Sequence, residues 1–235
     1  MAAEGLDGKL TRLFRKPYVV EQPVSDTVDE AVKALKAGKH VILSFGKYES
    51  DLDYLLVSNS LTRKIREAWV EATDSFRSSG GKEPRPLTIV VEEAHKLLSP
   101  AMAHQTAFGT IAREMRKYYV TLLIIDQRPS KIYDEVMSQL GSRLSGWLGD
   151  EGDIRAVLSG LSGRDMLRGM LARLEPKAEA LLLGMSVPMP LPVKSRRYDD
   201  RFWEELLPRA AKNPTTDATS RATPDEVERL RELGF

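Results

Sequence analysis

The sequence predicts an α/β protein with a mostly parallel sheet that helices cover on both faces. Two continuous apolar runs, Leu87–Val91 and Val120–Ile125, each stop at polar residues, and segments with helical periodicity surround them. Strands without polar alternation are typical of parallel sheets buried on both faces. Such sheets bind ligands at the carboxyl ends of their strands, so the polar residues that follow the two runs are the first candidates for a site.

The elements before the first run follow from local signals. Residues 1–24 are basic and predict a weakly structured lead-in. Thr27 and Glu30 match a capping box, which predicts the start of a helix, and Gly38 stands where that helix should end. We expect His40–Phe45 to be a short buried strand, with Val41–Phe45 parallel to the two later runs. Apolar residues at steps of three or four then predict a long amphipathic helix: Leu61, Ile65, Trp69, Ala72 and Phe76.

The elements after the first run continue the alternation. Helices are predicted at Phe108–Met115, from Ser130 to about Leu140 and at Asp199–Ala211, and strands at Arg143–Leu148, Glu179–Met185 and Pro192–Arg197. A linker at 212–222 and a short helix from Thr223 end the chain. The predicted organisation is a lead-in at 1–24, a core at 25–198 and a C-terminal extension at 199–235.

Composition excludes several classes of protein. Hydrophobic residues make up 42% and charged residues 29%, and the formal net charge is +1, so any nucleic-acid contact needs a local basic surface. The chain has no cysteine for disulfides or thiolate chemistry, which makes the cytoplasm the expected compartment. No apolar run approaches the ~20 residues of a membrane span, so no membrane contact is expected. Three histidines lack the spacing of metal ligands and are expected to be ordinary ones: His40, His95 and His104.

Two adjacent acids, Glu92 and Glu93, end the first apolar run. A buried strand that delivers paired carboxylates is the arrangement that holds Mg²⁺ and polarises water in phosphoryl transfer. Neighbouring strand residues point in opposite directions, so the two acids need not share one role. The alternative is an exposed strand end that leads into a helix N-terminus, where acids are favoured anyway.

A longer motif identifies a family. The stretch from Ile111 to Ser130, IAREMRKYYVTLLIIDQRPS, resembles the helix, strand and QRPS signature of the HerA/FtsK family of hexameric DNA-translocating ATPases, the HerA-like helicases. The preceding Glu-Glu-Ala-His and the later segment 179–193 fit the C-terminal part of that family's motor domain. The resemblance covers roughly residues 25–200, most firmly 87–148, and implies part of a RecA-like P-loop NTPase core.

The resemblance implies a role for each polar residue of the motif. Glu92 would organise Mg²⁺ beside bound ATP, and Glu93 would be the catalytic carboxylate. Gln127 would sense the γ-phosphate or orient the attacking water. Arg116, with Arg113 second, would be an arginine finger that reaches the nucleotide of the next subunit. A solvated helix face is the alternative for both arginines.

The chain departs from the family pattern in two ways. No G-x-x-x-x-G-K-[ST] occurs, since Gly46-Lys47 is followed by Tyr48, so no backbone cradle for phosphates is present. In the family that loop lies upstream of everything seen here, so we expect either a truncated motor or a subunit that relies on another, inactive alone. The family also usually has glycine where Met115 and Tyr119 stand.

The resemblance also implies partners. These are further copies in a homohexameric ring, double-stranded DNA, and a nuclease of the NurA kind in DNA end processing or phage defence. Two alternatives stay open: a conjugation or type IV secretion ATPase of the same superfamily, and a non-catalytic assembly module that keeps the fold.

Overall fold

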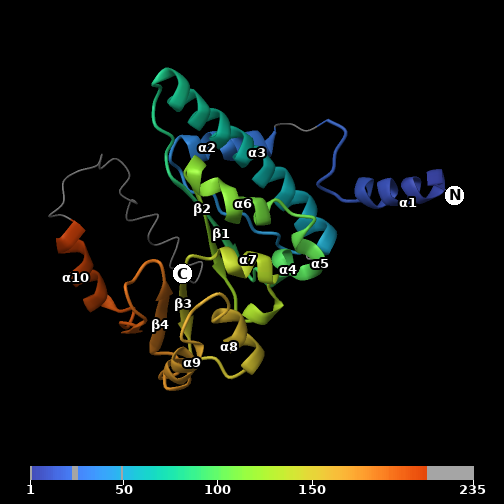
Figure 1. Cartoon of the computed structure of the whole chain (residues 1–235). Coiled ribbons are helices and arrows are strands. Elements are labelled where there is room, and N and C mark those ends of the chain that lie inside the picture. The colour runs from blue at the N-terminus through green and yellow to red at the C-terminus, as the bar shows by residue number, and fades with distance from the viewer. Residues whose placement is uncertain (1, 23–25, 49, 211–235) are drawn as a thin grey trace. The chain divides into compact units, whose positions relative to one another are not determined.

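The computed structural model describes residues 2–22, 26–48 and 50–210, which form a mixed α/β fold (Figure 1). The chain divides into two compact units, residues 1–193 and 194–235. The predicted linker at 212–222 and the helix from Thr223 lie outside the described residues. In chain order the elements are α1 (Ala2–Phe14), α2 (Thr27–Lys36), α3 (Asp51–Ser79), β1 (Leu87–Glu92), α4 (His95–Leu98), α5 (Pro100–Ala103), α6 (Phe108–Glu114), the 3₁₀ helix η1 (Met115–Tyr118), β2 (Val120–Ile125), the 3₁₀ helix η2 (Pro129–Lys131), α7 (Asp134–Gln139), β3 (Ser142–Gly146), α8 (Glu151–Val157), α9 (Arg164–Ala172), β4 (Glu179–Gly184), β5 (Leu191–Lys194) and α10 (Asp200–Ala210).

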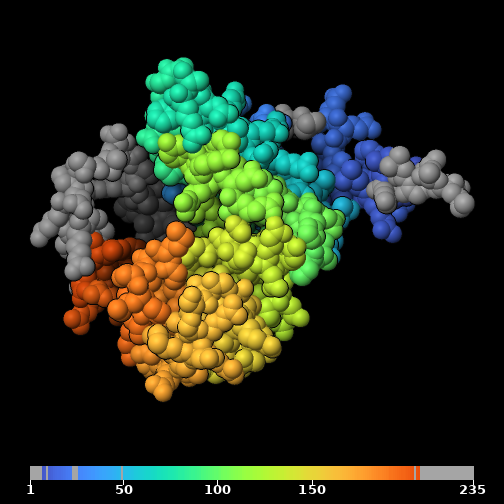
Figure 2. Space-filling view, viewed as in Figure 1, coloured from blue at the N-terminus to red at the C-terminus, as the bar shows by residue number. Residues whose placement is uncertain are grey.

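The two apolar runs form a parallel pair, as predicted. β1 and β2 pair in register from Leu87 opposite Val120 to Glu92 opposite Ile125. One face of the pair packs on the main core, which also takes side chains from α3, α6 and α7. Figure 2 shows the cyan-to-teal surface of α3 beside the green surface of the segment from α4 to α6. Because β1 and β2 run parallel, their carboxyl ends lie at the same edge of the sheet.

The other face of this pair is open. Val90, Leu123 and Ile125 are 52%, 47% and 47% exposed, and they alternate with the buried positions of the two strands. The prediction of helices on both faces is therefore wrong for this sheet within the described part of the chain. Apolar residues on both faces of a strand remain the signature of a strand that is covered twice.

The predicted strand at Val41–Phe45 is wrong. The structure has no strand between residues 40 and 45, and Ile42 is 94% exposed. A strand exists only when its backbone groups pair with a neighbour, and within the described residues no strand pairs with this segment. Its apolar composition signalled burial, but composition does not supply the pairing edge.

The later strands form a second small sheet in the order β3-β4-β5, where β3 and β4 pair antiparallel. The single mostly parallel sheet of the prediction is therefore two separate sheets. The buried Arg143 of β3 joins this sheet to the helices around it, since its guanidinium donates to the carbonyls of Met137, Val157 and Ser159.

The N-terminal part differs from the predicted lead-in because it contains helix α1. Helix α2 is capped by Asp26, whose carboxylate accepts from the backbone of Val28 and Asp29, so the predicted cap at Thr27 is one residue late. Helix α3 starts earlier than predicted, with a capping box between Ser50 and Asp53. In the part of the chain that the structure describes, no helix combines the length and apolarity that a bilayer crossing requires.

Candidate functional site

The candidate site is the edge where β1 and β2 end. Glu92 is the last residue of β1, and its side chain belongs to the exposed face that also carries Val90. Glu93 follows with a φ of 46°, a left-handed conformation that is uncommon for residues other than glycine. Strained backbone of this kind clusters at functional sites, where the surrounding structure enforces it. The fully buried Ala94 anchors the turn, since its N–H donates to the Ile125 carbonyl at 3.4 Å.

Within the described residues the Glu93 carboxylate forms an ion pair with Lys96. Its Oε2 lies 2.6 Å from the Lys96 ammonium, which is itself 5.5 Å from the centre of the Tyr54 ring of α3. The hydrogen bond from Lys96 holds the pKa of Glu93 below its usual value. Glu93 is therefore ionised at neutral pH, as a proton acceptor must be, and 55% of its side chain faces solvent.

Asp126 ties the exits of the two strands together. Its buried carboxylate accepts from the backbone N–H of His95 at 2.8 Å and of Arg128 at 2.6 Å, and it lies 2.8 Å from Nδ1 of the His95 ring. Burial pushes the pKa of Asp126 upward, but these hydrogen bonds outweigh it and leave the pKa lowered. The charged, fully engaged carboxylate thus fixes where α4 begins relative to the end of β2.

Gln127 follows Asp126 and is exposed. Because β1 and β2 are parallel and in register, Glu93 and Gln127 leave the sheet at the same edge. That edge is the place predicted for both. Within the described residues no hydrogen bond engages either the Gln127 amide or the Glu92 carboxylate, so both are available to a ligand.

Neither Arg116 nor Arg113 contacts the residues of this edge within the described part of the chain. Arg116 lies in η1, just before β2, whose six residues separate it from the carboxyl end of the strand by about 20 Å. Arg113 is paired with Glu135 of α7, and both side chains are close to half exposed. The Arg116 side chain is exposed, and none of the described residues forms a hydrogen bond or ion pair with it. The structure therefore does not bring either arginine to Glu93 of the same chain.

The two positions where the family has glycine behave differently. Tyr119 adopts φ 64°, a left-handed conformation that glycine takes without steric cost. Met115 is 1% exposed and fills the core beneath η1. The backbone at 119 thus keeps the shape that glycine would favour, while at 115 a long side chain takes up space.

A magnesium ion would have few protein ligands here. The described residues contain no group of three or more His, Cys, Asp or Glu side chains that fits a metal ion. Magnesium in phosphoryl-transfer sites usually takes one or two carboxylates, with water and phosphate oxygens completing its shell. The unengaged Glu92 carboxylate fits that requirement only when a nucleotide supplies the other oxygens.

Sequence reasoning missed three residues of this edge. No role was predicted for Asp126, although it follows the second apolar run, Lys96 was not expected in the site, and His95 was expected to be an ordinary histidine. The contacts of Asp126 with His95 join residues 31 positions apart, which no local pattern shows. The one local signal for Asp126 was its position as a polar residue directly after the second apolar run.

Comparison with known proteins finds relatives among archaeal helicases. The chain is 32% identical over 194 residues to the DNA double-strand break repair helicase HerA of Sulfurisphaera tokodaii, covering 81% of this chain and 37% of that protein. It is 26% identical over 191 residues to HerA of Pyrococcus furiosus, covering 79% and 34%. A probable helicase of Methanocaldococcus jannaschii is 27% identical, covering 73% and 33%. The chain therefore spans about a third of the length of these curated relatives.

Two solved structures are also similar in part. The genome packaging NTPase B204 of Sulfolobus turreted icosahedral virus 2, in complex with sulfate, matches with a TM-score of 0.47 at 9% identity, covering 80% of this chain and 87% of that one. The conjugation coupling protein TcpA of pCW3 matches with a TM-score of 0.47 at 16% identity, covering 75% and 49%. No protein-family model matches the chain. From the sequence relatives, which cover most of its own length, we conclude that the chain is a homologue of the HerA-type helicases.

Proposed function

We propose that this chain is the C-terminal part of the ATPase motor of a HerA-type translocase of double-stranded DNA, which acts with a nuclease of the NurA kind in DNA end processing or phage defence. Relatives in two archaea are named as DNA double-strand break repair helicases. The observation that carries the proposal is the meeting of Glu92, Glu93 and Gln127 at one sheet edge. Carboxylates and an amide at that place are what ATP hydrolysis requires.

Each residue has a role that its surroundings support. The Glu92 carboxylate, unengaged at the strand end, would hold magnesium, which would neutralise charge on the phosphates of a bound nucleotide. The ionised Glu93 accepts the proton of the attacking water, and Gln127 orients that water. Asp126 and His95 do not touch the nucleotide in this proposal but hold the two strand exits together.

The phosphate-binding loop comes from outside these 235 residues in this proposal. Two features support it besides the missing motif. Within the described residues β2 pairs only with β1, and β3 only with β4, so each has an edge of unpaired backbone groups. The bare apolar face of β1 and β2 lies next to the first of these edges. A strand with a following helix would pair with such an edge, cover such a face and bring the loop to Glu93.

The arginine finger acts between subunits in this proposal. Arg116 cannot reach Glu93 of its own chain across about 20 Å of sheet. Its exposed, unpaired guanidinium suits the nucleotide of a neighbouring copy in a homohexameric ring. Arg113 is the weaker candidate because Glu135 already neutralises it.

The second candidate function is a non-catalytic assembly module. The observation in its favour is that this sequence has no loop to cradle phosphates. Tagging the chain and purifying it with its partners from its native cells separates the two functions. The motor predicts ATP hydrolysis that double-stranded DNA stimulates, whereas an assembly without ATPase activity would favour the module. The chain alone should bind Mg·ATP with a dissociation constant weaker than about 1 mM, measured by titration calorimetry.

Mixed rings test the finger. Rings assembled from Arg116→Ala subunits and Glu93→Gln subunits contain some interfaces with an intact Glu93 from one chain and an intact Arg116 from the next. Such rings should hydrolyse ATP faster than either variant ring alone. An Arg116→Ala ring that keeps its rate within about threefold of wild type, well short of the ~10³-fold loss expected of a finger, would remove the assignment.

A further inference from the structure

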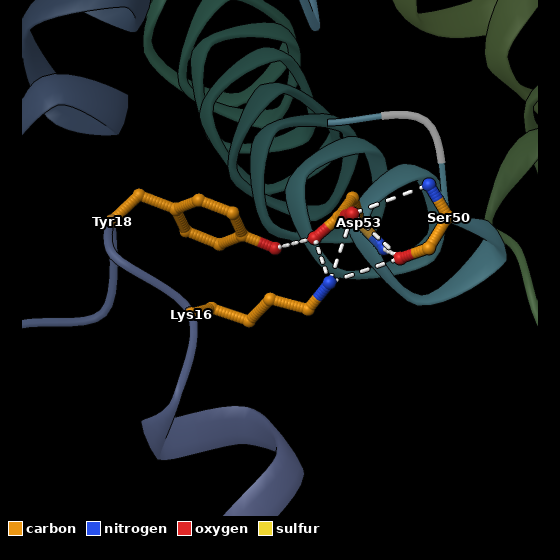
Figure 3. A network of polar contacts seen from close by, with 4 residues as sticks. All are labelled: Lys16, Tyr18, Ser50 and Asp53. Atoms are coloured by element: carbon orange, nitrogen blue, oxygen red, sulfur yellow. Dashed lines mark hydrogen bonds and ion pairs between the residues drawn. The ribbon is translucent and has the colours of Figure 1, made fainter. Parts of the chain in front are cut away.

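Helix α3 is fixed at its first turn by a buried carboxylate (Figure 3). Asp53 is 2% exposed, and the Lys16 ammonium lies 2.8 Å from its Oδ1 and 2.9 Å from its Oδ2. The Tyr18 hydroxyl donates to the same carboxylate, and so do the Ser50 hydroxyl and backbone N–H. Taking a charge out of water is costly unless partners satisfy it, and here these partners do so. The start of α3 is thus firmly held.

The second half of α3 is fixed by the main core. Ile65 and Trp69 are buried in that core, and Thr73 is fully buried one turn later. The Trp69 indole donates to the carbonyl of Arg85 at 2.9 Å, which ties the segment between α3 and β1 to the helix. A helix that is held at its start and along its buried face is a rigid support for whatever its last turns contact.

The last turns of α3 contact η1 through Arg77. Its Nη2 donates to the backbone carbonyl of Lys117 at 2.8 Å, and its guanidinium carbon lies 5.9 Å from the centre of the Tyr118 ring. The last carbonyls of a helix have no acceptor role within it, so a side-chain donor satisfies one of them here. Arg77 therefore connects the end of η1 to the rigid α3.

Other elements hold the same turn from its remaining sides. Met115 is buried beneath η1, and the backbone N–H of Leu87 donates to the carbonyl of Tyr119 at 2.9 Å. The Tyr119 hydroxyl donates to the Glu83 carboxylate, which raises the pKa of Tyr119. Arg77 adds a link on the solvent side, since its hydrogen bond to η1 is exposed.

Within η1 a single cation is left free among the described residues. The Lys117 ammonium lies 5.1 Å from the centre of the Tyr118 ring, so this side chain folds back on its own turn. The Arg116 side chain is exposed, and none of the described residues forms a hydrogen bond or ion pair with it. The turn thus combines a firmly held backbone with one guanidinium that is available to a partner.

We propose that Arg77 is the positioning residue of Arg116. By holding the carbonyl of the next residue, Arg77 fixes the place from which the Arg116 side chain extends. This inference rests on the proposed role of Arg116 in the ATP hydrolysis of a neighbouring copy. A side chain that acts across an interface must start from a fixed place, because a displacement of about 1 Å can cost about 10²-fold in rate. Arg77 does not touch the nucleotide in this proposal and acts through Arg116.

Hydrogen exchange of the chain alone, followed by mass spectrometry, tests the hold on η1 without any ATPase activity. Arg77→Ala should make the peptide that covers residues 115–120 exchange about threefold faster or more, because the turn loses its link to α3. Arg66→Ala, at an exposed arginine in the middle of α3, is the matched control and should leave that peptide unchanged. Unchanged exchange in Arg77→Ala would overturn the proposal. Faster exchange throughout the chain would overturn it as well, since Arg77 would then support the whole fold.

A double-mutant cycle in the assembled motor tests the action through Arg116. Arg77→Ala should lower kcat by about 10- to 100-fold and leave KM for ATP within about twofold, because a finger acts in the transition state. Added to Arg116→Ala, it should cost less than about twofold more, since no finger remains to be positioned. Arg77→Lys keeps a donor for the carbonyl and should recover most of the rate.

The outcomes of this cycle separate the two proposals. Equal losses from Arg77→Ala with and without Arg116 would show that Arg77 acts independently and would overturn the positioning role. A loss with Arg116→Ala but none with Arg77→Ala would overturn the positioning role and leave the finger standing. No loss with Arg116→Ala would overturn the finger assignment, and the positioning role with it.

Discussion

Two carboxylates, one at the start of α3 and one just after β1, have opposite surroundings. Asp53 is buried and receives hydrogen bonds from Lys16, Tyr18 and Ser50. Glu93 is mostly exposed, on a strained backbone, and has Lys96 as its charged partner. The first has no capacity left for a ligand, while the second keeps oxygens free. Their difference separates a carboxylate that holds the structure together from one that is available for chemistry.

The largest expected effect is on hydrolysis by the assembled motor. Glu93→Gln keeps the size of the side chain but removes the proton acceptor, so ATP hydrolysis should fall by about 10²–10⁴-fold. The melting temperature of the chain should stay within about 2 °C of wild type, because an exposed ion pair contributes little stability. Glu71→Gln, an exposed glutamate of α3, is the control and should leave both quantities unchanged. Equal losses in the two variants would contradict the role of Glu93.

Asp53→Asn should have its main effect on the stability of the chain, not on ATP hydrolysis. The uncharged amide no longer balances the Lys16 ammonium, so the melting temperature should fall by several degrees. Asp51→Asn, at the exposed aspartate two residues earlier in α3, is the matched control and should change the melting temperature little. Lys16, Ser50 and Tyr18 hold the pKa of Asp53 well below its usual value. The wild-type advantage over Asp53→Asn is therefore full above pH 4 and should shrink as the pH falls further, which pH-dependent melting curves measure.

The third prediction concerns the hydrogen bonds by which Asp126 connects the segments that follow β1 and β2. Asp126→Ala removes the charged acceptor from the part-buried backbone N–H of His95 and the exposed backbone N–H of Arg128, at a cost of about 1–3 kcal/mol in the free energy of unfolding. Asp126→Asn retains an acceptor oxygen and should cost less. Urea denaturation of both variants gives the comparison. An alanine variant as stable as the asparagine variant would show that these hydrogen bonds do not contribute to the free energy of unfolding.

The smallest effect is expected at alkaline pH. Burial and the hydrogen bond to Asp53 raise the pKa of Tyr18 to about 12, against about 10 in the unfolded chain. The stability that this shift contributes is complete below pH 10 and is lost as the pH rises towards 12. Tyr18→Phe should remove that part of the alkaline decline, whereas Tyr198→Phe, at an exposed tyrosine, should leave the decline as it is. Identical alkaline profiles for wild type and Tyr18→Phe would rule the shift out.

The sequence was informative where a local pattern has one physical outcome. The apolar runs that became β1 and β2, and the polar residues after them, follow directly from composition. The segment Val41–Phe45 shows the limit, because an apolar run becomes a strand only if another strand offers it an edge. Helix α1 was missed because Gly5, Gly8 and the charges of the first residues weaken its pattern.

The residues with a proposed role in hydrolysis could be predicted from the sequence, but the contacts between the residues of the site could not. Glu92 and Glu93 were predicted from the end of an apolar run and Gln127 from the resemblance to the family motif, and the edge at which they lie depends on strand direction. The contacts of Asp126 with His95 and of Lys96 with Tyr54 join elements that are distant in sequence. Such contacts depend on how α3, α4 and β2 pack, which no local spacing encodes.

The exposed apolar face of β1 and β2 affects how long the chain persists in a cell. Unpaired strand edges beside exposed Val90, Leu123 and Ile125 are templates for aggregation and targets for chaperones and proteases. If the proposed strand and helix cover this face, a copy made without them would be degraded or would precipitate, while a covered copy would survive. Quality control would thus match the amounts of the two parts without any regulation of their synthesis.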